Sequence, residues 1–184
     1  MTGQVIFEGK TKQGKAYIIR YPQEGDAQAI CDYINELSQE RTFIRFQGEI
    51  VSLEYETKYL QEQLEKIKKN KTVQLFIVCD NKVVGISAID LKDRTESHEG
   101  VLGISIAKDI RGEGIGKLLM RLTIEEAEKH LAGLRLITLG LFSDNQIAQK
   151  LYADFGFQEY GRLPEGLFRN QKYVDNIYMY KKIK

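Results

Sequence analysis

The feature that most constrains the fold is a glycine-rich turn between a strand and a helix. Val101–Ala107 is an apolar run typical of a strand, and Gly112, Gly114 and Gly116 follow it closely. From Gly114 the apolar positions take helical spacing, on the stripe Ile115, Leu118, Leu119, Leu122, Ala127 and Leu131. A strand that feeds an amphipathic helix in this way predicts a layered fold in which helices pack on a sheet.

The same turn is suited to binding an anion. The first turn of a helix has backbone N–H groups without partners and the positive end of the helix dipole, and both attract phosphate. Glycines remove the Cβ atoms that would block its approach. Dipole attraction contributes only ~0.3–1 kcal/mol, so several N–H bonds together with Arg111 and Lys117 would be needed for useful affinity. The alternative is that the glycines only tighten a strand-to-helix corner.

Two common phosphate-binding motifs do not fit the turn. A Walker loop needs Ser or Thr after its lysine, whereas Leu118 follows Lys117. A dinucleotide fingerprint needs G-x-G-x-x-G/A, whereas these glycines are spaced by two and Lys117 occupies the position that must be small. We therefore disfavour a kinase-like protein and a nicotinamide enzyme.

The rest of the chain alternates strand and helix patterns within one domain, residues 1–184, with a core from about 16 to 182. Helices are expected from Asp26, after the N-cap Ser52, and from Ser143-Asp144-Asn145 to Phe155. Val73–Cys79 and Val83–Ile89 are expected to form an antiparallel hairpin. Further strands are expected near Ala16–Ile19, Leu134–Leu141, Phe157–Gly161 and Tyr173–Tyr180, with a polar start before them and a flexible insert at Pro164 and Gly166. This order predicts an α/β (α+β) fold around one central mixed sheet.

The turn resembles the signature of the GCN5-related N-acetyltransferases, the GNAT family. Arg111-Gly112-Glu113-Gly114-Ile115-Gly116 fits the pattern Q/R-x-x-G-x-G/A, and the resemblance extends from about Ala16 to Tyr180. It implies a single GNAT-like domain whose central sheet is mixed, mostly antiparallel and flanked by helices. It also implies that one molecule of acetyl-coenzyme A is held at two points along its length. The turn would hold the pyrophosphate through Arg111, Gly112, Gly114, Ile115, Gly116 and Lys117, and the strand residues Ile104, Ser105 and Ile106 would pair with the pantetheine arm.

A second pair of residues lies on the helix that precedes Gly156. Asn145 and Tyr152 are seven residues apart, nearly two turns, so they should share about 10 Å of one helix face. The family resemblance implies that Asn145 contacts the pantetheine arm and that Tyr152 protonates the departing thiolate. With a pKa near ~10 the phenol would match the thiolate and contribute about 10²-fold to the rate. The alternative is that Tyr152 is a core aromatic beside Leu151 and Phe155.

The acceptor side is less determined. The attacking ammonium must lose a proton, and Glu99, Glu49, Asp175 and His98 are weak candidates for the base. The family builds its acceptor site where this chain has two sets of basic and aromatic residues, Arg41, Phe43, Arg45 and Phe46, and Leu167, Phe168, Arg169 and Tyr173. Such residues suit an acceptor with a carboxylate or an apolar body, although loops packed on the core would show the same pattern.

Composition narrows the function further. Lys and Arg number 27 against 26 Asp and Glu, a net charge of +1, so no overall positive field favours nucleic acid. No apolar run approaches the ~20 residues that span a bilayer. Cys31 and Cys79 lie far apart, which argues against a zinc site or a disulfide framework and favours the cytoplasm.

We therefore expect a metal-independent N-acetyltransferase. It would move the acetyl group from acetyl-CoA to a primary amine of a small molecule or peptide by direct attack in a ternary complex. The alternative is a non-catalytic module that senses coenzyme A, and the last strand could also pair across a homodimer.

Overall fold

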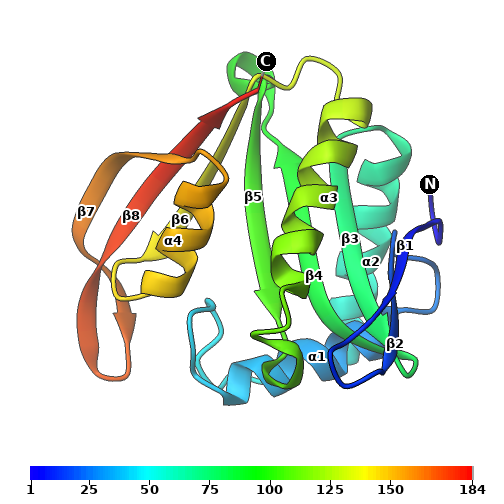
Figure 1. The fold of residues 1–184 in the computed structure, drawn as a ribbon. Helices are drawn as coiled ribbons and strands as arrows, with labels where there is room; N and C mark the ends of the chain where they lie inside the picture. The colour runs from blue at the N-terminus through cyan, green and yellow to red at the C-terminus, as the bar shows by residue number, and fades with distance from the viewer. Residues whose placement is uncertain (184) are drawn as a thin grey trace.

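The computed structural model describes residues 1–183 and contains one eight-stranded sheet with four α-helices (Figure 1). The strands are β1 (Val5–Lys10), β2 (Ala16–Arg20), β3 (Thr72–Cys79), β4 (Lys82–Leu91), β5 (Glu99–Ile106), β6 (Leu136–Phe142), β7 (Gln158–Arg169) and β8 (Lys172–Lys182). The helices are α1 (Ala27–Gln39), α2 (Leu53–Lys68), α3 (Ile115–His130) and α4 (Gln146–Asp154). Short 3-10 turns lie at Arg94–Glu96 and Lys108–Ile110.

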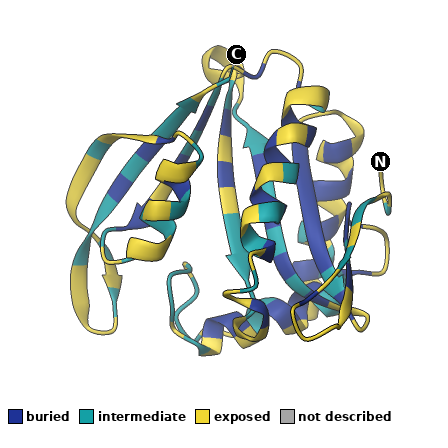
Figure 2. Cartoon of the chain, viewed as in Figure 1, coloured by how far each residue is buried: buried dark blue, intermediate teal, exposed yellow. Residues whose placement is uncertain are grey.

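The sheet is mixed and mostly antiparallel, as predicted. Its strand order is β1-β2-β3-β4-β5-β6-β8-β7, and β5–β6 is the parallel pair among antiparallel neighbours. One core cluster packs α3 and α4 against the sheet, and a second packs α1 and α2 against the opposite face of β3 and β4. Because helices cover both of its faces, β3 is buried along almost its whole length (Figure 2).

The parallel pair is joined only where its two strands begin. The register runs from Glu99 opposite Leu136 to Val101 opposite Thr138. Beyond these residues β5 stays paired with β4 and β6 stays paired with β8, so β5 and β6 diverge (Figure 1). Among residues 1–183, the edge of β5 that faces β6 therefore has no strand partner beyond the paired residues. Its backbone there is available to another extended chain, except for the Ile106 carbonyl, which accepts a hydrogen bond from Nε of Arg111.

Local sequence explains where the helices begin. Ser52 accepts a hydrogen bond from the Tyr55 amide at 3.2 Å, which caps α2 as predicted. Acidic residues lie in the first turn of α2 and lysines in its last turn, which complements the helix dipole. At the start of α1, Asp26 instead forms a buried two-bond ion pair with Arg20 of β2, at 2.7 and 2.8 Å.

Two segments differ from the sequence expectation. The polar start of the chain contains β1, which pairs with β2; as an edge strand it buries few side chains and so shows only a weak pattern. The insert expected at Pro164 and Gly166 is part of the β7–β8 hairpin, where pairing shifts register between Leu163 and Leu167 and then continues. An edge strand tolerates proline because its outward N–H is not needed. No helix within residues 1–183 is long and apolar enough to cross a membrane.

Candidate active site

The turn at residues 111–117, called the signature turn below, presents a row of unbonded backbone amides. Gly112 and Gly114 have φ angles of 78° and 81°, in the left-handed region that favours glycine. Gly114 is the N-cap of α3, and no side chain caps this helix. Within residues 1–183, no protein acceptor takes a hydrogen bond from the N–H groups of residues 112–117. The turn therefore offers several donors and the positive end of α3 to one anion.

The space outside this turn is open. A Cβ atom placed on Gly112 or Gly114 would meet no other atom within 4 Å. Gly116 has a different role, because a Cβ there would lie 3.3 Å from Cγ1 of Ile106. Gly116 thus allows α3 to approach the end of β5, while Gly112 and Gly114 leave the amides accessible.

The two basic residues expected at the turn both contact the protein. Arg111 donates from Nε to the Ile106 carbonyl at 2.8 Å and pairs through Nη2 with Glu40 at 2.8 Å, so it ties the turn to the end of α1. Lys117 is 61% exposed, and its Nζ lies 3.7 Å from a carboxylate oxygen of Asp154 at the end of α4. An exposed pair of this kind is worth little, so Lys117 remains free to turn toward a ligand.

A third cation at the turn, Lys12, was missed by the sequence analysis. It lies between β1 and β2, where its backbone N–H donates to Glu113 at 2.6 Å and its Nζ to the Gly112 carbonyl at 3.0 Å. Lys12 is 100 residues from Gly112, and β1 was not expected, so no local signal could have found it. Its charge reaches the turn only because β1 and β2 pair with the rest of the sheet.

The strand residues expected to hold the pantetheine arm lie on the unpaired edge of β5. Ile104 and Ile106 pack toward the core cluster that includes α3. Ser105 points to the opposite face, where its hydroxyl lies 2.9 Å from the hydroxyl of Tyr33 on α1. The hydroxyl contact and the packing leave the backbone of this edge as the part that a ligand can use.

Tyr152 packs as a core aromatic, and its hydroxyl has no protein partner within residues 1–183. The residue is 7% exposed, and its ring packs against Phe157 at 5.9 Å between centroids, as a core aromatic would. Its hydroxyl forms no hydrogen bond within residues 1–183, and this oxygen retains some contact with solvent. Burial raises the pKa of Tyr152 to about 12, so the expected value near ~10 is wrong for this environment.

Asn145, at the other end of α4, is its N-cap. Its side-chain Oδ1 accepts a hydrogen bond from the backbone N–H of Ala148 at 3.1 Å, and its backbone N–H donates to the Phe142 carbonyl at 3.0 Å. The side-chain nitrogen keeps its two donors. Asn145 therefore stands at the end of β6, beside the diverging part of the β5–β6 pair.

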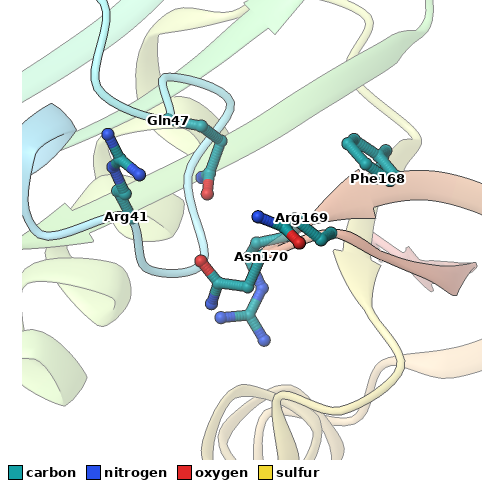
Figure 3. A pocket seen from close by; sticks show the side chains of 6 residues that line it. Arg41, Gln47, Phe168, Arg169 and Asn170 are labelled. Carbon is teal, nitrogen blue, oxygen red and sulfur yellow. The ribbon is translucent and has the colours of Figure 1, made fainter.

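The expected acceptor region contains a cavity of about 420 Å³ between two segments (Figure 3). Its lining is Arg41, Gln47, Phe168, Arg169, Asn170 and Gln171. The first two come from the segment between α1 and α2, and the others from the tip of the β7–β8 hairpin. Arg169 stacks on the ring of Phe43 at 4.3 Å and pairs with Asp144 at 2.5 Å. Of the two expected sets, Arg41, Phe168 and Arg169 line the cavity and Phe43 supports it, while Arg45, Phe46, Leu167 and Tyr173 are not part of its lining.

The candidate bases have different surroundings. Burial opposes ionisation of Glu99, but bonds from Lys92 at 2.8 Å and Thr138 at 2.6 Å lower its pKa. Asp175 is engaged by Arg162 at 3.5 Å and by the Glu165 amide at 3.2 Å.

Glu49 lies near the cavity. Its carboxylate accepts a hydrogen bond from the backbone N–H of Gln47, and this bond, together with the nearby Arg41, lowers the pKa of Glu49. His98 contributes its carbonyl to the amides of Arg135 and Leu136 at the start of β6. Among residues 1–183, no group of three or more His, Cys, Asp and Glu side chains could hold a metal ion.

The fold and the turn together match a known family. The sequence profile described as the Acetyltransferase (GNAT) family matches residues 32–157, most of the chain. The chain belongs to the GNAT family. It is therefore an acyltransferase, an N-acetyltransferase, which confirms the family and the fold that the resemblance implied.

Individual proteins that are similar to this GNAT protein are also acetyltransferases or share its fold. The L-amino acid N-acetyltransferase AaaT of Escherichia coli (strain K12) is 33% identical over 117 residues, which cover 62% of this chain and 72% of that protein. A GNAT acetyltransferase from Streptococcus pneumoniae superposes with a TM-score of 0.82 at 28% identity, covering 91% of this chain and 99% of that one. The yncA protein of Salmonella typhimurium, solved with its cofactor acetyl-CoA, shares the fold with a TM-score of 0.77 at 16% identity, over 91% and 94% of the two chains.

Proposed function

We propose that the protein transfers the acetyl group of acetyl-CoA to a primary amine of a small molecule or peptide, within a ternary complex. The observation that carries this proposal is the row of unbonded amides at residues 112–117, next to the unpaired edge of β5. The amides fit a diphosphate, and an extended arm can pair with the edge at residues 104–106. A relative solved with acetyl-CoA supports the choice of cofactor.

The residues around this edge divide the binding between them. The turn glycines with Ile115 would bind the diphosphate, and Lys117 and Lys12 would add positive charge near it. Arg111 is already engaged by Glu40 and Ile106, so we assign it mainly to holding the turn and the strand end together. The free side-chain donors of Asn145 would reach the pantetheine amides from the opposite side.

The reaction then needs a charge stabiliser and a proton donor. The ammonium first loses one proton to a carboxylate and then to solvent. The neutral amine nitrogen attacks the thioester carbonyl, the C–N bond forms and the C–S bond breaks, and the second proton that the nitrogen loses balances the proton that the departing sulfur gains. A free N–H of β5 would stabilise the oxyanion, since donors aimed at that oxygen cost no reorganisation. The acceptor must attack as a neutral amine, and Glu49 is the carboxylate near the cavity that could take its proton.

The raised pKa of Tyr152 defines its part in the reaction. A phenol with a pKa of about 12 stays protonated at neutral pH and is always able to donate. Complete transfer to a thiolate of pKa ~8.5 would be uphill in water, but burial disfavours the thiolate as well and moves the two values closer. Tyr152 therefore donates a hydrogen bond to the sulfur as the negative charge develops.

The test combines binding with turnover. Acetyl-CoA should stabilise the protein against heat, by roughly 2.7 kcal/mol at about 100 times its dissociation constant. Amine acceptors should accelerate release of the coenzyme A thiol above the rate of hydrolysis. Tyr152→Phe should lower kcat about 10²-fold with unchanged acetyl-CoA binding, because it removes only the hydroxyl.

Tyr160→Phe is the matched control, since Tyr160 is 59% exposed on β7 and outside the proposed site. Binding without accelerated thiol release for any amine would contradict transfer and favour a coenzyme A sensor. Equal rates for Tyr152→Phe and the wild type would remove Tyr152 from the mechanism.

A further inference from the structure

The cavity between the α1–α2 segment and the β7–β8 tip holds three polar groups that lack partners. Within residues 1–183, the guanidinium of Arg41, which is exposed at the cavity, makes no ion pair and no hydrogen bond, and the two other groups are buried. Nε of Arg169 is buried without an acceptor, and Oε1 of Gln47 is buried without a donor. Buried polar groups in proteins are nearly always bonded, so unpartnered ones that line a cavity point to a ligand.

The two buried groups, on Gln47 and Arg169, are held in fixed orientations. The side-chain nitrogen of Gln47 donates to the carbonyls of Thr42, Ile44 and Phe46 at 2.9, 2.6 and 3.1 Å, which determines which end of the amide is the oxygen. Arg169 is stacked on Phe43 and paired with Asp144 through Nη2, which leaves its Nε free. Little rotational freedom would be lost when a ligand binds these two groups.

The lining selects one kind of acceptor. It contains two guanidinium groups, three amides and one aromatic ring, and no carboxylate. A polyamine has no carboxylate for these guanidinium groups to bind, and a peptide N-terminus has none beside its amine. Two arginine donors fit a carboxylate, and a buried amide oxygen fits an amine N–H. The exposed ring of Phe168 adds an apolar surface, and about 420 Å³ is enough for a small ligand.

We propose that the acceptor is an α-amino acid with an apolar side chain, whose carboxylate is bound by Arg41 and Arg169 and whose amine is held by Gln47 Oε1. The proposal rests on the proposed acetyl transfer and names its acceptor class. These three groups match the carboxylate and the amine that an amino acid carries on one carbon.

The cavity is connected to the cofactor side through both of its walls. Glu40, directly before Arg41, pairs with Arg111 of the signature turn at 2.8 Å. Arg169 pairs with Asp144, directly before Asn145. One wall of the cavity is thus anchored to the signature turn and the other to the start of α4, the two regions proposed to bind the cofactor.

The experiment compares L-leucine with L-leucinamide as acceptors, with spermidine and a leucine-initiated tripeptide as further probes. The wild type should prefer leucine to its amide. Arg41→Gln should lower kcat/KM for leucine about 10- to 100-fold, the effect of losing a charged hydrogen bond, and change kcat/KM for the amide little. Because the two amines differ in basicity, the quantity compared is the leucine-to-amide ratio in the variant against the same ratio in the wild type.

Arg121→Gln is the matched control, since Arg121 is exposed on α3 and, within residues 1–183, forms one ion pair, with Glu125. It should leave the ratio unchanged, and Arg41→Lys should recover part of it. Calorimetric titration of leucine and leucinamide, with coenzyme A present, tests the same contacts without turnover: Arg41→Gln should weaken binding of leucine alone.

The outcomes separate the two proposals. If no amine releases thiol, acetyl transfer fails. If amines are acetylated but the leucine-to-amide ratio is the same in wild type and Arg41→Gln, or if spermidine or the tripeptide is the best acceptor, the amino-acid proposal is overturned while transfer stands. If leucine does not bind in calorimetry, the amino-acid proposal is overturned whatever the turnover.

Discussion

Two glycines at opposite ends of α3 allow the role of the signature turn to be measured. Gly114 precedes the helix with φ 81°, and Gly133 follows it with φ 82°. A Cβ atom at either position would meet nothing within 4 Å, so neither substitution by alanine creates a clash. The variants Gly114→Ala and Gly133→Ala therefore carry similar backbone strain. They differ in that the methyl group lies beside the unbonded amides of the signature turn only in Gly114→Ala.

The cost in stability should be similar for both variants. Left-handed strain for alanine is about 1–2 kcal/mol, and the reduced freedom of the unfolded chain offsets about 0.4–1 kcal/mol of it. The net is about 1 kcal/mol. At ~2.1 cal/mol/K per residue, a chain of 184 residues has an unfolding entropy near 0.4 kcal/mol/K, so each Tm should fall by about 2–3 °C.

Cofactor binding should separate the two variants. The methyl group at Gly114 would occupy the open space in front of the unbonded amides. Loss of even one charge-assisted bond to phosphate costs about 1.5–3 kcal/mol, so the Kd of coenzyme A should rise roughly 10- to 100-fold. Gly133→Ala should bind coenzyme A like the wild type. Calorimetric titration and thermal unfolding of the two variants measure both quantities.

Two results would refute this reasoning. Wild-type affinity in Gly114→Ala would show that the turn does not hold the phosphates. Equal weakening in both variants would show that the stability of α3, and not access to the amides, controls binding.

Three further predictions concern charge and proton binding. The proposed mechanism uses protonated Tyr152, whose pKa burial raises to about 12, so kcat should show no alkaline decline due to this group below about pH 11; a decline near pH ~10 that Tyr152→Phe abolishes would contradict this. Lys12→Ala should weaken coenzyme A binding several-fold, less so at high salt, and an unchanged Kd at low salt would remove Lys12 from the site. Burial opposes ionisation of Glu126, but bonds from Lys129 and Tyr21 lower its pKa, so its contribution to stability is present above about pH 4.5 and is lost as the pH falls through the lowered value. Tyr21→Phe should flatten this acid dependence in urea unfolding, and an acid dependence equal to the wild type would disprove the link.

The signature turn is the part of the site that local sequence could predict. Glycines between a strand and a helix determine their own backbone conformation and leave the first-turn amides unpaired, because both properties depend on neighbours within about four residues. The N-caps Ser52 and Asn145 were predictable for the same reason.

Contacts between distant segments were not predictable from such local patterns. Arg41 and Arg169 lie in the acceptor region that the family resemblance implied, but Gln47 was not among those residues. Its unpartnered oxygen depends on three carbonyls that an irregular segment brings together. Lys12 reaches the turn only because β1 and β2 complete one side of the sheet.

The sequence by itself determined the strand, the turn, the helix and hence the family, because these features depend on short-range spacing of apolar residues and glycines. The tertiary structure decided where β5 and β6 diverge, how far burial raises the pKa of Tyr152, and which side chains line the cavity between the α1–α2 segment and the β7–β8 tip. Each of these depends on burial and on contacts between residues many tens of positions apart in the sequence. Such contacts form only when the strands assemble into the sheet and the helices pack on it.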